Sequence, residues 1–235
     1  MNAKERRAAR HAGDGAVRTR ARPALSPERL VDTALALVAE EGYEALTMRR
    51  LATALDTGPA SLYAHVVNKA DLDELLISRL CSEVVLPTPD PSSWSEQARD
   101  VCAQLREVYL RYPGISRAAL AMAPTALEIL RVNDGLLGVL LAGGAAPVDA
   151  AYACDALVLY VAAYCLEVSV ARARSTSDDL DWVVDRDEMV RRFEALPAER
   201  FPYITRHAAQ LTAGEGHDRF DFTVGLMLDG LAPRA

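Results

Sequence analysis

The sequence predicts an all-α fold, made of a small N-terminal unit of three helices and a larger helical bundle. Hydrophobic residues make up 51% of the 235 residues, enough for a core, and alanine and leucine dominate among them. Aromatic residues are only 6%, and no stretch shows the sustained alternation of β-branched residues that is typical of strands. Apolar residues instead recur at helical spacing between proline and glycine breaks.

The charge is distributed unevenly along the chain. The formal net charge is −7, yet residues 1–25 hold seven basic residues and two acidic ones, a local charge of +5 that leaves −12 for the remainder. Few large apolar groups occur in this segment, so we expect residues 1–25 to be a basic flexible arm. It is either a solvated tail or an arm that follows DNA phosphates or enters the minor groove through Arg18, Arg20 and Arg22.

The first helix is predicted over residues 27–41. Ser26 is a suitable N-cap, Pro27 fits the first helical position, and Glu28 places an acid in the first turn. Gly42 then ends the helix. We expect this helix to support the segment that follows it.

Residues 46–69 are predicted to form two short helices joined by a tight turn. Thr47 caps the first, and the segment 56–58 (Asp-Thr-Gly) interrupts it. Pro59 opens the second helix, which turns Leu62 and Val66 inward. A helix-turn-helix of this size fits the major groove of DNA, with the start of its second helix at the base edges.

The segment T-M-R-R-L-A-x-x-L … G-P-A-S-L-Y-x-H-V-x-N-K-x-x-L resembles the DNA-binding domain of TetR-type transcriptional regulators, the tetracycline-repressor family. The match runs from about Ser26 to Ser82. The alternative is a helical hairpin that only packs. Asp56 stands where the family usually has glycine, and Thr57 stands where the family often has an apolar residue. We expect these two differences to alter the turn only slightly. The resemblance implies that DNA is contacted by Thr47, Arg49, Gly58, Pro59, Ala60, Ser61, Tyr63, His65 and Lys69.

These residue types suit different contacts. Tyr63 and His65 can donate to phosphates, although His65 could instead be a packing histidine. Lys69 is expected at the end of the second helix as a phosphate clamp. Arg49 can reach a guanine edge or a phosphate, and the small residues that follow the proline allow the helix to approach the bases closely.

A connecting helix is predicted over residues 70–85 and is stopped by prolines 87, 89 and 91. We therefore divide the chain into the arm (1–25), a DNA-binding domain (26–86) and a ligand-binding and dimerisation domain (87–235). Helices of the latter are expected at 93–112, 115–122, 124–141, 150–170, around 193–196, 201–213 and 217–231, with an acidic loop at 175–187.

The 150–170 helix is apolar nearly all round. It is also long enough to cross a membrane, since about 20 residues suffice. Asp155 and Glu167 argue against a membrane location, and a buried helix shared by the core and a dimer interface has the same composition. The last helix has two apolar stripes, one of which includes Phe222 and Leu226, so it needs two neighbours. Its sequence resembles the C-terminal domain of the tetracycline-repressor subgroup, which implies a homodimer through a four-helix bundle of these two helices.

The resemblance also implies an effector pocket between about residues 93 and 175. The candidate ligand-binding residues are apolar, or carry polar tips that interrupt apolar helix faces. For each aromatic candidate the alternative is an ordinary core residue, and for Asp155 it is a carboxylate on the helix surface or in an interface. No histidine occurs between His65 and His207, which argues against a magnesium-chelated tetracycline and for an aromatic or polyketide-like effector without a metal. The candidates for the ligand site are Leu105, Tyr109, Met122, Asn133, Leu137, Tyr152, Asp155, Tyr160 and Tyr164.

The expected function is that of a cytoplasmic repressor that binds a near-palindromic operator as a homodimer and is released by a small molecule. A regulator that needs no ligand, or an activator, is the first alternative. An all-α enzyme is a weaker one, because no phosphate loop, metal-ligand spacing or nucleophile motif is present. We expect no cofactor, no metal and no catalytic residue, and four buried, reduced cysteines.

Overall fold

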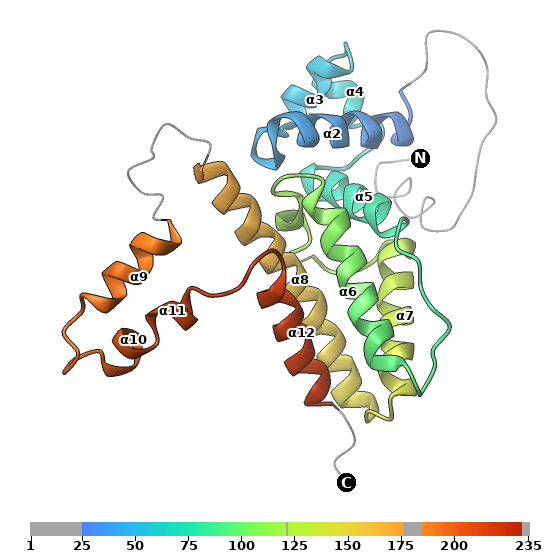
Figure 1. Cartoon of the computed structure of the whole chain (residues 1–235). Helices are drawn as coiled ribbons and strands as arrows, with labels where there is room; N and C mark the ends of the chain where they lie inside the picture. Colours follow the sequence, from blue (N-terminus) through green and yellow to red (C-terminus); the bar gives the residue numbers. More distant parts are fainter. Residues whose placement is uncertain (1–24, 121, 176–184, 232–235) are drawn as a thin grey trace.

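The computed structural model describes residues 25–120, 122–175 and 185–231, and all regular structure in these ranges is helical (Figure 1). The all-α prediction is therefore confirmed. The helices are α2 (Pro27–Glu41), η1 (Tyr43–Ala45), α3 (Met48–Ala54), α4 (Pro59–Leu62), α5 (Lys69–Cys81), α6 (Trp94–Leu110), η2 (Ile115–Ala118), α7 (Leu127–Ala142), α8 (Pro147–Ser175), α9 (Arg186–Glu194), α10 (Pro202–Arg206), α11 (Ala208–Leu211) and α12 (Asp218–Asp229).

Helices α2, α3 and α4 form the small unit at the top of Figure 1. The side chain of Ser26 accepts from the backbone N–H of Arg29 at 3.2 Å, and that of Thr47 accepts from Arg50 at 3.0 Å, so both helices begin at the predicted caps. Gly42 ends α2 with a φ of +80°, a conformation that glycine adopts without a steric cost.

The second helix of the motif is shorter than predicted. Helix α4 covers only Pro59–Leu62, after which the chain turns, although Leu62 and Val66 are buried as expected. The backbone N–H of Val67 donates to the Asp71 carboxylate at 2.8 Å instead of continuing the helical pattern. The prediction that Lys69 ends this helix was wrong, because Asn68 caps α5 and Lys69 is the first residue of α5.

Helix α5 links the small unit to the body. It packs against α2 on one side and against α6, α7 and η2 on the other. It ends at Cys81, four residues before the predicted end at residue 85. The following segment lies along α7, where an added Cβ on Gly135 would stand 2.6 Å from a methyl carbon of Leu86.

Helices α6, α7, α8 and α12 form the body. Three further predicted boundaries were wrong. The 115–122 helix is the short 3₁₀ helix η2, α7 begins at Leu127 and not at Pro124, and the 201–213 helix is broken at His207 into α10 and α11. Helix α8 has the length and hydropathy of a membrane span, but here it packs on α6, α7, α12 and η2.

Helices α9, α10 and α11 pack chiefly on one another and lie apart from the body in Figure 1. They are connected to α12 by a segment without regular structure. Most of the acidic loop predicted at 175–187 lies outside the described residues, and α9 already begins at Arg186.

Candidate DNA interface and ligand cavity

The outer surface of α4 is formed by small residues and one tyrosine. Pro59, Ala60 and Ser61 are exposed, and an added Cβ on Gly58 would meet no atom within 4 Å. Tyr63 follows on the same side with 46% of its surface exposed. This surface is therefore open to a close approach by a DNA groove, and it carries a hydroxyl that can donate to phosphate.

Two neighbouring arginines on α3 differ in their contacts. Arg50 forms an ion pair with Glu41, with its Nε 3.1 Å from both carboxylate oxygens, and this hydrogen bond lowers the pKa of Glu41. The guanidinium of Arg49 is exposed and makes no hydrogen bond or ion pair with a described residue. Of the two, Arg49 is available to DNA. Thr47 is exposed and uses its oxygen as the helix cap, so its hydroxyl proton remains able to donate.

The other two predicted DNA contacts are partly occupied by the protein itself. The Lys69 ammonium forms an ion pair with Asp73, donates to the Tyr43 hydroxyl at 3.0 Å and lies 4.2 Å from the centre of that ring. His65 is half-buried near Glu28, whose pKa is lowered first by hydrogen bonding to Ser26 and further by the charge of His65. Arg18, Arg20 and Arg22 of the arm lie outside the described residues.

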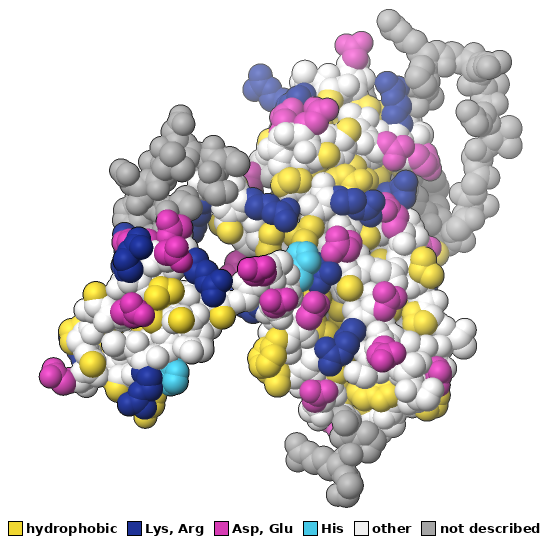
Figure 2. Space-filling model, viewed as in Figure 1, with side chains coloured by type: hydrophobic (Ala, Val, Ile, Leu, Met, Phe, Trp, Pro, Cys, Tyr) yellow, Lys and Arg dark blue, Asp and Glu magenta, His cyan; other side chains and the backbone are white. Residues whose placement is uncertain are grey.

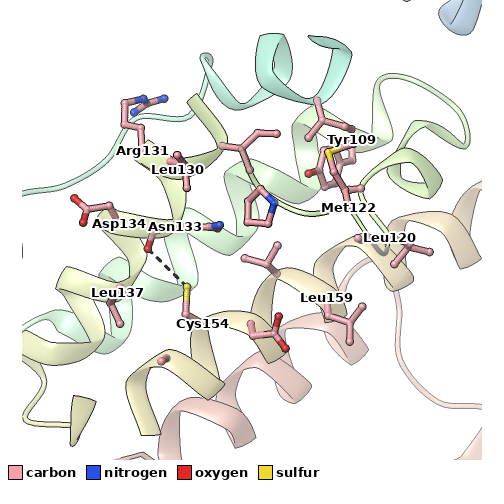
Figure 3. Close-up of a pocket in the computed structure, with 18 residues that line it drawn as sticks. Tyr109, Leu120, Met122, Leu130, Arg131, Asn133, Asp134, Leu137, Cys154 and Leu159 are labelled. Atoms are coloured by element: carbon pink, nitrogen blue, oxygen red, sulfur yellow. Dashed lines mark hydrogen bonds between the residues drawn. The ribbon is translucent and has the colours of Figure 1, made fainter. Parts of the chain in front are cut away.

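The body contains a cavity of about 830 Å³ (Figure 3). Its wall comes from α5, α6, α7, α8 and the segment between η2 and α7. The lining residues are Ile77, Tyr109, Ala119, Leu120, Met122, Pro124, Ile129, Leu130, Arg131, Asn133, Asp134, Leu137, Ala151, Cys154, Asp155, Val158, Leu159 and Ala162. A mostly apolar wall with a few polar groups is typical of small-molecule sites.

The structure brings five of the predicted ligand residues together in this cavity: Tyr109, Met122, Asn133, Leu137 and Asp155. The polar ones are of different kinds, namely a phenol, an amide and a carboxylate. Their role toward a ligand remains a prediction.

Four predicted ligand residues lie elsewhere. Leu105 is a buried core residue of α6 and does not line the cavity. Tyr160 and Tyr164 face α12, where they contact the Phe220 ring with centroid distances of 5.6 and 5.0 Å. At 100° per residue they lie about 140° and about 180° around α8 from Asp155. Tyr152 is 73% exposed and does not line the cavity.

Several cavity residues were not predicted. Cys154, Val158, Leu159 and Ala162 share one face of α8 with Asp155. Helical periodicity finds them only after the structure has selected Asp155 over the predicted tyrosines on other sides of this helix. Arg131 carried no such signal. Its guanidinium donates to the Cys81 and Val84 carbonyls at 2.7 and 3.1 Å, which are tertiary contacts.

The four cysteines are buried, as predicted, and all four are free thiols. Burial raises the pKa of Cys81, Cys102 and Cys165 to about 12 and that of Cys154 to about 11. All four are therefore protonated thiols at neutral pH and poor nucleophiles. No group of side chains in the described part of the chain could hold a metal ion.

A separate groove runs between α8 and α12. Its lining includes Tyr152, Ala153, Ala156, Leu226 and Met227. The first predicted stripe of α12 is Phe220, Val224, Met227, Leu228 and Leu231. Its residues Phe220, Val224 and Leu228 are buried in the chain itself, and Met227 and Leu231 are half-buried. Phe222 and Leu226 of the second stripe are instead 66% and 56% exposed. Figure 2 shows apolar side chains on the surface beside α12.

Comparisons with known proteins agree with this geometry. Residues 30–74 match the family described as "Bacterial regulatory proteins, tetR family", and residues 86–234 match "Tetracyclin repressor-like, C-terminal domain". The chain is 26% identical to the HTH-type transcriptional repressor DrrR1 of Streptomyces coeruleorubidus, over 89% of this chain and 78% of the relative. It is 31% identical to the Escherichia coli tetracycline repressor protein class C, over 63% and 68%.

Among solved structures, the TetR family protein ActR of Streptomyces coelicolor in complex with actinorhodin is 33% identical, with a TM-score of 0.78, over 89% of this chain and 96% of that one. Together the two family matches span nearly all of the described residues. The first covers the helix-turn-helix and the second covers the helical body. The chain belongs to the TetR family of DNA-binding transcriptional regulators.

Proposed function

We propose that this regulator is a dimeric repressor whose release from DNA is controlled by a small molecule in the α5–α8 cavity. The observation that carries the proposal is the position of α5. It holds the helix-turn-helix through α2, and it also forms part of the cavity wall through Ile77. A ligand that favours one position of α5 would therefore change the position of the reading helix.

DNA binding is supported by the exposed surface of α4 and by Arg49 of α3, whose guanidinium makes no hydrogen bond or ion pair with a described residue. Small residues at the start of α4 permit a close approach to base edges, while Arg49, Tyr63 and Thr47 are placed to contact a guanine or phosphates. Lys69 contributes as a phosphate contact only if DNA competes with Asp73 for its ammonium.

Dimerisation is supported by the groove between α8 and α12. Tyr152 of α8 and Leu226 of α12 line this groove and are exposed, and Phe222 is a further exposed apolar side chain on α12. A second copy would cover the same surface and place two α4 helices on one face of the DNA, one for each half of a near-palindromic operator.

Coupling between ligand and DNA is supported by three contacts of α5 with the cavity region. Ile77 lines the cavity, Glu74 accepts a hydrogen bond from the Thr125 hydroxyl, and Arg131 holds the carbonyls at the end of α5. A ligand acts through them only if it binds the two positions of α5 with different affinities. A ligand-independent regulator would have no use for the cavity.

The direct test uses the purified protein and DNA that flanks its own coding region. We expect a retarded complex at moderate salt with a fragment that contains an inverted repeat, and none with a fragment in which one half of the repeat is scrambled. Tyr63→Ala should weaken binding to all sequences, because a phosphate contact is lost, while the oligomeric state is unchanged. Absence of a specific complex would contradict the proposal.

A further inference from the structure

We infer that the α5–α8 cavity takes a mostly apolar ligand that carries a protonated amine near Asp155 and a hydrogen-bonding oxygen at the buried end near Tyr109. This inference rests on the proposed ligand-responsive function and specifies the chemical class of the ligand. It is based on the polar groups of the cavity that are not already paired within the protein or directed away from the cavity.

Tyr109 provides the buried polar group. Its side chain is only 3% exposed, and its hydroxyl makes no hydrogen bond with any described residue. Among the described side chains, only the Ser116 hydroxyl is both sealed from solvent and without a hydrogen-bond partner. The Tyr109 hydroxyl also lacks a partner, so it is not sealed, and it opens into the cavity that Tyr109 lines. In Figure 3 it points toward the cavity interior. Burial raises its pKa well above 10, so it remains protonated and can donate to a ligand oxygen.

Two of the three charged lining residues are directed elsewhere. Arg131 donates to the Glu128 carboxylate at 2.6 Å and to two carbonyls at the end of α5, so its charge is already neutralised. In Figure 3 the charged ends of Arg131 and Asp134 both point away from the cavity. Neither group therefore balances a charge inside it.

Asp155 is the remaining charged lining residue. It is exposed at the cavity margin and makes no hydrogen bond or ion pair with a described residue. Its charge reaches the cavity wall, because it adds to the effect of burial in raising the pKa of the neighbouring Cys154 thiol to about 11. An uncompensated carboxylate beside an apolar wall favours a cationic ligand group and disfavours an anionic one.

The test uses three probes that share one fluorophore and differ in terminal charge: dansylcadaverine (an amine), N-dansylhexylamine (neutral) and N-dansyl-6-aminohexanoic acid (a carboxylate). Binding to the full chain is followed by the blue shift of dansyl emission and by displacement. We expect the amine to bind about tenfold more tightly than the neutral probe, which corresponds to ~1.4 kcal/mol, and the carboxylate to bind most weakly.

Two matched variants assign the preference to one residue. Asp155→Asn should bring the amine to the affinity of the neutral probe. Glu167→Gln removes an exposed acid that pairs with Arg219, on the same helix but outside the cavity, and should keep the preference. Tyr109→Phe should weaken all three probes about threefold to tenfold, because one hydrogen bond is lost.

Equal binding of the three probes, tighter binding of the carboxylate, or no binding of any of them would overturn the inference. DNA retardation measured on the same preparation separates this result from a failure of the proposed function. Loss of charge selectivity with intact operator binding would refute only the ligand class.

Discussion

Asp56 has a backbone conformation that is unusual for its residue type. Its φ is +51°, and among the described residues it is the one residue other than glycine with a positive φ. This left-handed position in the turn between α3 and α4 explains physically why glycine is usual there in the family. Aspartate tolerates this region better than most residues, so the turn still forms, at a cost.

Asp56→Gly is therefore expected to raise the free energy of unfolding by about 0.5–1 kcal/mol, because the steric cost of the left-handed conformation is removed and exceeds the added entropy of the unfolded glycine. Urea titration measures this change. Thr57→Gly, at a neighbouring position without positive φ, should lower stability instead. A destabilised Asp56→Gly variant would show that the aspartate side chain stabilises the turn.

Arg49 and Arg50 should behave differently although they are adjacent. Arg49→Ala is expected to weaken operator binding by about tenfold or more, since an uncommitted guanidinium is lost from the DNA-facing surface. Arg50→Ala removes a pairing with Glu41 and should change operator affinity little. Fluorescence anisotropy with labelled operator DNA measures both. Equal losses would mean that DNA displaces Glu41 from Arg50.

At the scale of elements, α8 has different roles on different faces. One face lines the cavity through Cys154, Asp155 and Val158, the opposite face packs Tyr164 against α12, and Tyr152 is left on the surface between them. A helix with apolar side chains on all of these faces has no clear amphipathic pattern. Its sequence therefore predicts burial but does not reveal which side faces the ligand.

The end of α5 is held by a side chain from α7. Arg131→Met should remove the hydrogen bonds to the Cys81 and Val84 carbonyls while keeping most of the side-chain volume. We expect faster amide hydrogen exchange over residues 78–86, because the C-terminal end of α5 then opens more often.

Arg111→Met is the matched control for this prediction. Arg111 is an exposed arginine that pairs with Glu83 near the same end of α5, but it does not line the cavity. It should leave exchange over this segment almost unchanged. Similar exchange in both variants would show that Arg131 does not restrain α5.

At the scale of the whole molecule, the buried and exposed stripes of α12 differ in what they hold together. Phe220, Val224 and Leu228 are buried within the chain, so they stabilise the subunit. Phe222 and Leu226 are exposed in the single chain although they are large and apolar. This contrast favours a second copy as the partner of α12.

Leu226→Glu is expected to produce a folded monomer, because it places a charge in the proposed interface without disturbing the core of the subunit. Sedimentation velocity measures the oligomeric state, and circular dichroism verifies the helical content. Leu228→Ala should instead lower the stability of the subunit by about 2–5 kcal/mol, because it leaves a cavity. A Leu226→Glu variant that remains dimeric would place the interface elsewhere.

The sequence by itself determined the helical class, the starts of α2 and α3 at Ser26 and Thr47, and the family. These features depend on local chemistry, such as a capping oxygen or a proline at the first helical position, which acts over three or four residues. It also identified Tyr109, Asn133 and Asp155 as interruptions of apolar faces.

Only the tertiary structure decided the length of α4, the commitment of Lys69 to Asp73, and the face of α8 that lines the cavity. Each of these features depends on groups that packing brings together from separate elements or turns. The periodicity of apolar residues within one helix carries no information about such contacts. The link from Arg131 to the end of α5 spans about fifty residues for the same reason.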